Sequence, residues 1–166
     1  MATDISRLKK QLKEKDRSLR ASAAEELADI ETPEAINALL ETLNEEKDPY
    51  IIELLIRLLG EAGASEAVSV IITLLNHEDE DVVEQCLDAL SDLADEENAI
   101  DIFLSLDELE RNVDDMQLRN NIQNHIEHVL PFLRTFIIES RNRIKELENK
   151  VVQLQKELQK VKKTKK

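Results

Sequence analysis

The chain contains three histidines, and two of them have a spacing that could support metal chemistry. His125 and His128 lie about one helical turn apart, which can bring two imidazoles to one metal ion. Glu127 lies between them, but the pair has no H-E-x-x-H arrangement and no obvious third ligand nearby. Both histidines also fall outside the apolar stripe of their segment, so we expect them to be exposed and to bind no metal.

Two further groups have simpler structural explanations than chemical ones. The acidic run 78–81 lacks the turn glycine and the spaced final glutamate of a calcium loop. Acids at the start of a helix favour the positive end of its dipole, and we expect that role here. Cys86 occupies an apolar position, where we expect a buried and unreactive thiol. We therefore predict no catalytic residue, no metal and no cofactor.

The composition excludes several classes of protein. The chain has 166 residues, of which 42% are apolar and 35% charged, enough for one domain with an appendage. Its two glycines, Gly60 and Gly63, cannot form a dinucleotide fingerprint or a phosphate-binding loop. A single cysteine fits a reducing compartment, and no apolar stretch is long enough to cross a bilayer. We predict a cytoplasmic, nearly all-helical protein that does not enter a membrane.

The charge is distributed unevenly along the chain. Residues 1–20 have a net charge of +4, residues 21–140 a net charge of −25, and residues 141–166 a net charge of +7. An acidic body repels nucleic acid and attracts basic partners. The acids could equally be solvated helix faces and caps.

A repeat of about 32 residues organises most of the chain. Matching segments begin at Asp16, Asp48 and Asp79, each with an aspartate placed to cap a helix. Apolar or small residues follow at +3, +7, +8 and +11, which lie on one helix face, and a second helix follows after a short break. Neither helix buries its apolar face alone, so neighbouring pairs must stack. The core positions are Leu19, Ala23, Ala24 and Leu27, then Ile51, Leu55, Ile56 and Leu59, then Val82, Cys86, Leu87 and Leu90.

The first copy resembles the short HEAT-like repeat of the PBS-lyase type. The resemblance rests on Asp16, Leu19, Arg20, Ala23 and Leu27, followed by Pro33-Glu34-Ala35-Ile36 and Leu39-Leu40. It implies an all-α fold, a short α-solenoid of helical hairpins. The arginine common at the +4 position of the family is kept at Arg20 but replaced by Ile52 and Val83. A bilin lyase would also need a chromophore pocket, and a short stack with few aromatics argues against one.

We divide the chain into a repeat domain, residues 1–140, and a C-terminal helix, residues 141–166. The domain would comprise a cap helix at 4–14 and repeats at about 16–45, 48–77, 79–112 and 115–138. Proline costs no hydrogen bond at the start of a helix, so we expect Pro131 to begin the final helix.

The C-terminal helix has a heptad pattern. Its seam contains Ile144, Leu147, Val151, Leu154, Leu158 and Val161. β-branched residues at a and leucine at d favour parallel two-stranded coiled coils, in which Arg143 would pair with Glu148 across the dimer. The pattern leaves three outcomes open: a homodimer, a coiled coil with a different chain, or an exposed or folded-back helix. The lysines after Val161 form a basic tail.

A second candidate surface lies on the second helices of the hairpins. Two rows of matched positions lie beside the core stripe, Ala38, Val70 and Ile102 in one and Thr42, Leu74 and Leu106 in the other, and they become more apolar along the chain. The candidate contact residues are Val70, Leu74, Ile102 and Leu106. If exposed, they would form a groove for a partner helix. Alternatively they pack against adjacent repeats, because a helix inside a stack is buried on three sides.

These patterns together favour a non-catalytic adaptor. It would bind other proteins through an acidic solenoid and dimerise, or attach to a partner, through its C-terminal helix. One alternative is phosphate or nucleic-acid binding by the basic ends, although aromatics for base stacking are missing. A metal-dependent or lyase-type enzyme is the least favoured alternative.

Overall fold

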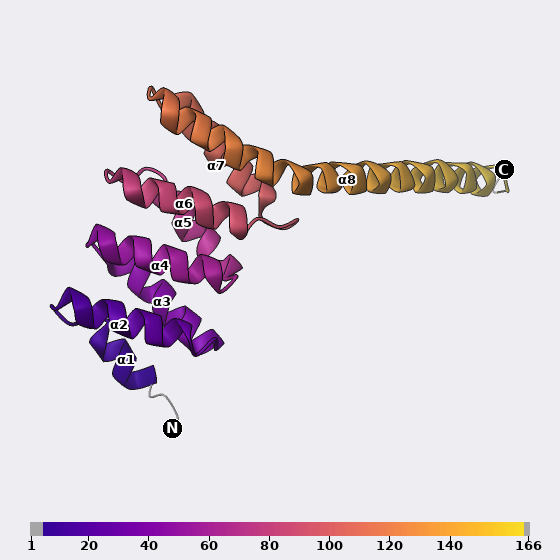
Figure 1. Cartoon of the computed structure of the whole chain (residues 1–166). Coiled ribbons are helices and arrows are strands. Elements are labelled where there is room, and N and C mark those ends of the chain that lie inside the picture. Colours follow the sequence, from indigo (N-terminus) through magenta and orange to yellow (C-terminus); the bar gives the residue numbers. More distant parts are fainter. Residues whose placement is uncertain (1–4, 165–166) are drawn as a thin grey trace.

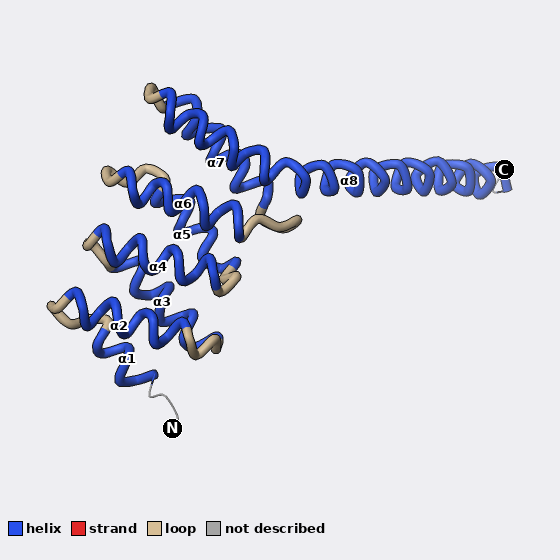
Figure 2. The backbone as a smooth tube through the Cα atoms, viewed as in Figure 1, coloured by secondary structure: helices blue, strands red, loops and turns tan. Residues whose placement is uncertain are grey.

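The computed structural model describes residues 5–164, except for the side chains of residues 136, 139 and 156–164. Within these residues the regular elements are helices (Figure 2). They are α1 (Ile5–Gln11), α2 (Arg17–Ala28), α3 (Pro33–Glu45), α4 (Pro49–Glu61), a short 3-10 helix (Ser65–Ala67), α5 (Val68–Leu74), α6 (Glu80–Asp92), α7 (Ala99–Asn112) and α8 (Met116–Thr164). The first predicted position of the cap helix, residue 4, lies outside the described residues.

The helices stack as hairpins in two layers, which confirms the predicted all-α solenoid (Figure 1). One layer contains α2, α4, α6 and the beginning of α8. The other contains α1, α3, α5 and α7. Neighbouring helices of the first layer are in direct contact, so the equivalent segments of successive repeats lie side by side. The second half of α8 projects away from the stack as a single straight helix.

The core is formed by burial between neighbouring hairpins. Helix α4 lies between α2 and α6 and has eight buried residues, among them Leu55 and Leu59 with no exposed surface. At Gly60, a Cβ would lie only 3.3 Å from the Cβ of Ala89 in α6, so glycine allows these two helices to approach closely. Helix α4 is therefore the helix on which both neighbouring repeats pack.

One predicted core position is wrong. Leu19 and Ile51 hold the same place in successive repeats, but Leu19 is 43% exposed whereas Ile51 is fully buried. The difference arises because Ile51 lies in α4, which α2 and α6 flank, whereas α2 has α4 on one side and only the cap helix α1 near the other. The repeat pattern specifies which face of the helix is apolar, but a neighbour is needed to bury it.

The inner turns of the first two hairpins share one backbone feature. Glu31 has φ 51° and Gly63 has φ 64°, and these residues are 32 positions apart. Left-handed backbone reverses the chain after a helix, and glycine adopts it without a Cβ penalty. The same turn is thus repeated, even though the first copy has glutamate there.

The expected helix start at Pro131 is also wrong. Pro131 lies inside α8, which continues without a break from Met116 to Thr164. Among the described residues, left-handed backbone occurs only at Glu31 and Gly63, neither of which lies in α8. A proline inside a helix removes one hydrogen bond, but it does not by itself reverse the chain. Residues 115–138 therefore do not fold as a fourth hairpin.

Three of the four repeat aspartates cap helices as expected. Asp16 accepts a hydrogen bond from the Ser18 amide at 2.8 Å, Asp79 from the Asp81 amide at 3.1 Å, and Asp115 from the Leu118 amide at 2.8 Å. Asp48 does not: its side chain makes no capping bond to α4. It instead accepts from Arg17 Nε at 2.7 Å and from Arg20 at 3.3 Å.

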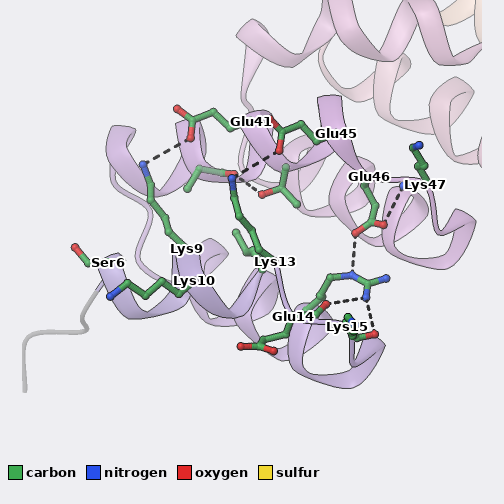
Figure 3. Close-up of a pocket in the computed structure, with 14 residues that line it drawn as sticks. Ser6, Lys9, Lys10, Lys13, Glu14, Lys15, Glu41, Glu45, Glu46 and Lys47 are labelled. Carbon is green, nitrogen blue, oxygen red and sulfur yellow. Dashed lines mark hydrogen bonds and ion pairs between the residues drawn. The ribbon is translucent and has the colours of Figure 1, made fainter.

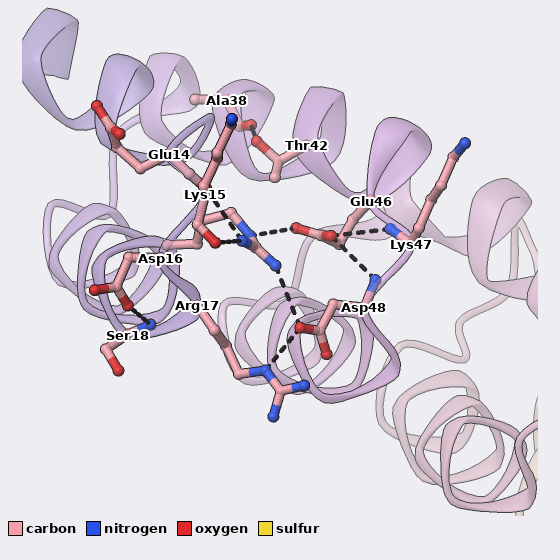
Figure 4. Close-up of polar contacts among 11 residues, drawn as sticks. Glu14, Lys15, Asp16, Arg17, Ser18, Ala38, Thr42, Glu46, Lys47 and Asp48 are labelled. Carbon is pink, nitrogen blue, oxygen red and sulfur yellow. Dashed lines mark hydrogen bonds and ion pairs between the residues drawn. The ribbon is translucent and has the colours of Figure 1, made fainter.

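Arg20 joins the first two repeats through Glu46 and Asp48, both of which are labelled in Figure 4. Its guanidinium donates to Glu46 at 2.9 Å, to Asp48, and to the carbonyls of Glu14 and Lys15 at 3.0 and 3.2 Å. Only 13% of its side chain is exposed. Arg119 holds the same place four residues after Asp115, and it likewise donates to a carbonyl six residues earlier, that of Val113. Arg20 and Arg119 thus each bind the loop before their own helix, and Arg20 also binds the loop that follows α3.

The pair Leu19 and Ile51 tests whether the repeats are held together by burial. We expect Ile51→Ala to lower the free energy of unfolding by about 2–5 kcal/mol, because it leaves a cavity between α2 and α6. Leu19→Ala, at the equivalent position, should cost less than about 1 kcal/mol because that side chain is already partly in water. Urea unfolding followed by circular dichroism measures both. Equal losses would contradict the packing described here.

Arg20 allows a second test of repeat joining. Replacing Arg20 with alanine should destabilise the chain by roughly 2 kcal/mol, since it leaves the largely buried carboxylate of Glu46 without its charged donor. Arg57→Ala is the matched control, because its ion pair with Glu61 is exposed and lies within one helix. Such pairs contribute only about 0.3–0.5 kcal/mol. A loss at Arg20 no larger than at Arg57 would show that the network does not hold the repeats.

Candidate protein-interaction surfaces

The projecting part of α8 exposes the predicted heptad seam. Ile144, Leu147, Val151 and Leu154 are 57%, 50%, 51% and 63% exposed. This part of the helix extends away from the stack (Figure 1). Apolar side chains at heptad spacing on an isolated helix form a surface that a second helix can cover. We refer to α8 from residue 137 onward as the arm.

The remaining heptad positions are only partly described. The side chains of Leu158 and Val161 lie outside the described residues. Arg143, expected to pair with Glu148 across a dimer, approaches Glu146 of its own helix at 3.5 Å. Both side chains are more than 70% exposed, so this contact is weak and leaves Arg143 able to pair elsewhere.

The predicted groove on the second helices is not where we expected it. Ile102 and Leu106 are fully buried, and Val70 and Leu74 are half-buried. Ile102 and Leu106 are therefore core residues and cannot contact a partner in this structure. For Ile102 and Leu106 the outcome is therefore the alternative, packing against adjacent repeats.

Ile102 and Leu106 are buried because helix α7 turns a different face to the core from the one that α3 and α5 turn to it. Leu40, Ile72 and Leu104 are 32 positions apart and apolar in all three repeats. Leu40 and Ile72 are half-buried, whereas Leu104 is 56% exposed. In the third repeat Ile102 and Leu106 therefore lie in the core, and Leu104 lies outside it. Helix α7 is thus rotated by about one residue relative to the helices before it.

This rotation opens an apolar groove between α5 and α7. Two neighbouring hollows of about 530 and 110 Å³ lie between these helices; Ile72 and Ser105 line both, and we treat the two together as one groove. Val68, Ile72 and Leu104 contribute its apolar surface. We call it the α5–α7 groove. The sequence contained a signal for it, the apolar row Leu40, Ile72 and Leu104, but we predicted no groove from that row.

Acidic side chains line the same groove without opposing cations. Glu66 and Asp101 lie in the larger hollow and Glu108 in the smaller one, and all three are exposed. The other polar residues that line the described groove are serines and asparagines, with no lysine or arginine among them. The groove therefore combines an apolar floor with an unopposed negative charge.

A larger groove of about 780 Å³ lies between α1 and α3, and it has mixed charge (Figure 3). Lysines of α1 and of the turn after it face glutamates of α3: Lys9 lies 3.8 Å from Glu41, and Lys13 lies 3.7 Å from Glu45. Both pairs span 32 residues. These pairs offset part of the basic charge of the groove and connect the N-terminal segment to the first repeat, so Lys9 and Lys13 are engaged within the chain.

His125 is less exposed than we predicted, although His128 is exposed. The His125 side chain is 13% exposed, lies 2.7 Å from the Ser91 hydroxyl through Nδ1, and lies 3.7 Å from Asp88 through Nε2. Burial lowers its pKa below 6.5, nearby His128 lowers it further, and Asp88 and Asp92 oppose the shift. These contacts join α8 to α6.

The described residues provide little for catalysis around His125. No group of three or more histidine, cysteine or acidic side chains in this part of the chain is arranged to hold a metal ion. Ser91 lies within α6, where backbone amides are engaged in the helix and cannot stabilise an oxyanion. Cys86 is fully buried, and burial raises the pKa of its thiol to about 12, so it is not a nucleophile at neutral pH.

Comparison with known families agrees with this geometry. A family model for HEAT repeats matches residues 43–119, and one for the PBS lyase HEAT-like repeat matches residues 19–45. Residues 19–119 are HEAT repeats. This confirms the resemblance seen in the first copy. HEAT repeats generally act as protein-interaction scaffolds and are typically non-catalytic.

A solved structure supports the same fold. The HEAT-repeat chain is similar to an engineered protein whose crystal structure was determined by the Northeast Structural Genomics Consortium, with 21% identity and a TM-score of 0.53. The similarity covers 77% of this chain but 63% of the engineered one. No curated protein matches the chain significantly. Within the described residues, none of the helices combines the length and the apolarity that a membrane crossing requires.

The environment of His125 predicts a pH dependence of HEAT-body stability. Because the folded-state pKa lies below the usual 6.5, the unfolded chain binds more protons as the pH falls through 6.5. Stability is therefore present above that pH and is lost on acidification. We expect His125→Gln to reduce the loss between pH 7.5 and 5.5, and His128→Gln to preserve most of it. Urea midpoints at both pH values provide the measurement. If the midpoint of His125→Gln falls between pH 7.5 and 5.5 as much as that of the parent chain, the assignment is wrong.

Proposed function

We propose that this protein is a non-catalytic adaptor of the cytoplasm. Its acidic HEAT-repeat body binds other proteins, and its arm pairs with the arm of a second copy. The lone cysteine, buried at Cys86, supports a reducing compartment. The net charge of −25 over residues 21–140 favours basic partners, whose association with the body would weaken as salt increases.

The observation that carries the proposal is the exposed seam of the arm. Four successive heptad positions, Ile144, Leu147, Val151 and Leu154, are each at least half exposed. The alternating spacing of three and four residues keeps them on one side of the helix. A single helix gains nothing from such a seam in water, whereas a pair of helices buries it.

The residue types favour self-pairing in parallel. β-branched Ile144 and Val151 at a, with Leu147 and Leu154 at d, is the combination that suits two parallel strands. Residues 144–161 span roughly 27 Å, which is short for a stable coiled coil. We therefore expect a dimer that dissociates on dilution, with the two HEAT bodies at the same end of the pair.

Two adjacent valines provide a matched test. Val151 is 51% exposed and Val152 is 48% exposed, but only Val151 lies on the seam. We expect the intact chain to be a dimer by light scattering at tens of micromolar. Val151→Glu should convert it to a monomer, because it places a charge in the seam, and Val152→Glu should leave it dimeric.

The alternative outcomes are distinct. If the intact chain is monomeric at all concentrations, self-pairing is wrong, and a coiled coil with a different chain or an unpaired helix remains. If both valine variants dissociate equally, charge on the arm rather than the seam controls association. Circular dichroism of each variant confirms that the HEAT body remains folded.

A further inference from the structure

We propose that the α5–α7 groove binds a basic amphipathic segment of another protein. One bulky apolar side chain of that segment would pack over Val68, Ile72 and Leu104. Lysine or arginine residues on either side of it would pair with acids of the groove. The inference rests on the scaffold function proposed above, but it does not depend on pairing of the arms.

The spacing along α7 defines what the partner must present. Asp101, Leu104 and Glu108 are three and four residues apart, so they lie on one stripe of the helix. From Asp101 to Glu108 the stripe extends roughly 10 Å. It presents acid, leucine and acid in order. A partner helix with a basic residue, a leucine one turn later and a second basic residue one turn after that has the complementary order.

The exposure of Leu104 supports an apolar contact. It is 56% exposed, although its equivalents Leu40 and Ile72 are half-buried. Val68, which also lines the groove, is only 6% exposed, so the floor is already packed. A partner side chain would remove the exposed part of Leu104 from water without rearranging the stack.

The charges support a basic rather than an acidic partner. In the α1–α3 groove, lysines and glutamates of the chain already oppose one another, as at Lys9 and Glu41. In the α5–α7 groove, Glu66, Asp101 and Glu108 form no ion pair among the described residues. A cation brought there gains favourable interactions without breaking any within the chain.

The arm itself is a competing occupant, because it also has basic and apolar residues. Arg143, Leu147 and Lys150 follow the complementary order. We assign the groove to a different protein because Leu147 lies on the seam that pairs with a second arm. A peptide of residues 141–166 is therefore included in the test.

The test uses the intact chain and a fluorescent helical peptide that carries lysine, leucine and lysine at positions i, i+4 and i+7. Fluorescence anisotropy should show binding that weakens with salt, and a peptide with glutamates in place of the lysines should not bind. Asp101→Lys combined with Glu108→Lys should weaken binding about tenfold or more, because it removes two pairings and adds repulsion.

Two matched controls place the binding in the groove. Glu96→Lys combined with Glu97→Lys changes the net charge equally on exposed residues outside the groove, and it should weaken binding by less than about threefold. Leu104→Ser should weaken binding about tenfold, whereas Met116→Ser, which removes a side chain of similar exposure, should not.

Several results would overturn the inference. Equal losses in the two charge-reversed pairs would show nonspecific attraction to an acidic body. Full binding by Leu104→Ser would exclude the apolar contact. Tighter binding of the 141–166 peptide, with the same dependence on Asp101 and Glu108, would assign the groove to a second copy instead. Repeating the titration with Val151→Glu separates the two proposals, since loss of the dimer should leave groove binding intact.

Discussion

The structure depends on apolar burial shared between neighbouring hairpins. No hairpin has a core of its own: Leu55 and Leu59 of α4 are fully buried because α2 and α6 lie on either side. Stability is then a sum of interfaces between neighbours, and elements at the end of the stack lack one of them. Leu19 is 43% exposed for this reason. The same condition determines where the chain has apolar surface to offer a partner, because such surface remains where the stack has no next neighbour.

Polar groups decide how the stack is fastened and what it attracts. The core of the described residues is wholly apolar, and the charges lie around it. At the N-terminal end, side chains of opposite charge lie close together. Arg20 binds Glu46 and Asp48, and Lys9 and Lys13 lie near Glu41 and Glu45 of α3. Farther along, acids face one another. The pKa of Glu53 is raised by partial burial and by the nearby Asp81 and Asp79, so protonation relieves repulsion there. Basic partners would relieve the same repulsion without a change of pH.

The sequence predicted the features that repeat and missed those that arise once. Thirty-two-residue periodicity revealed the hairpins, most core positions and three of four caps, since each is specified within its own copy. The rotation of α7 could not be predicted, because Leu104 keeps its apolar type while Ile102 and Leu106 replace it in the core. The burial of His125 depends on Ser91 of a neighbouring helix. Asp48 looks like a cap but lies beside two arginines that are distant in sequence.

The arm follows from the same constraint as the stack. Leu133 packs against the core, and Ile137 and Ile144, which continue its heptad register, are 62% and 57% exposed. The arm therefore continues the apolar register of the body, with an interruption at Ser140: α6 and α7 contact the beginning of α8, and the apolar residues beyond the stack are exposed. Pro131 lies near this transition without bending the chain back. Residues that would have completed a fourth hairpin instead carry the apolar face outward, where a helix of another chain can take the position that α7 has in the body.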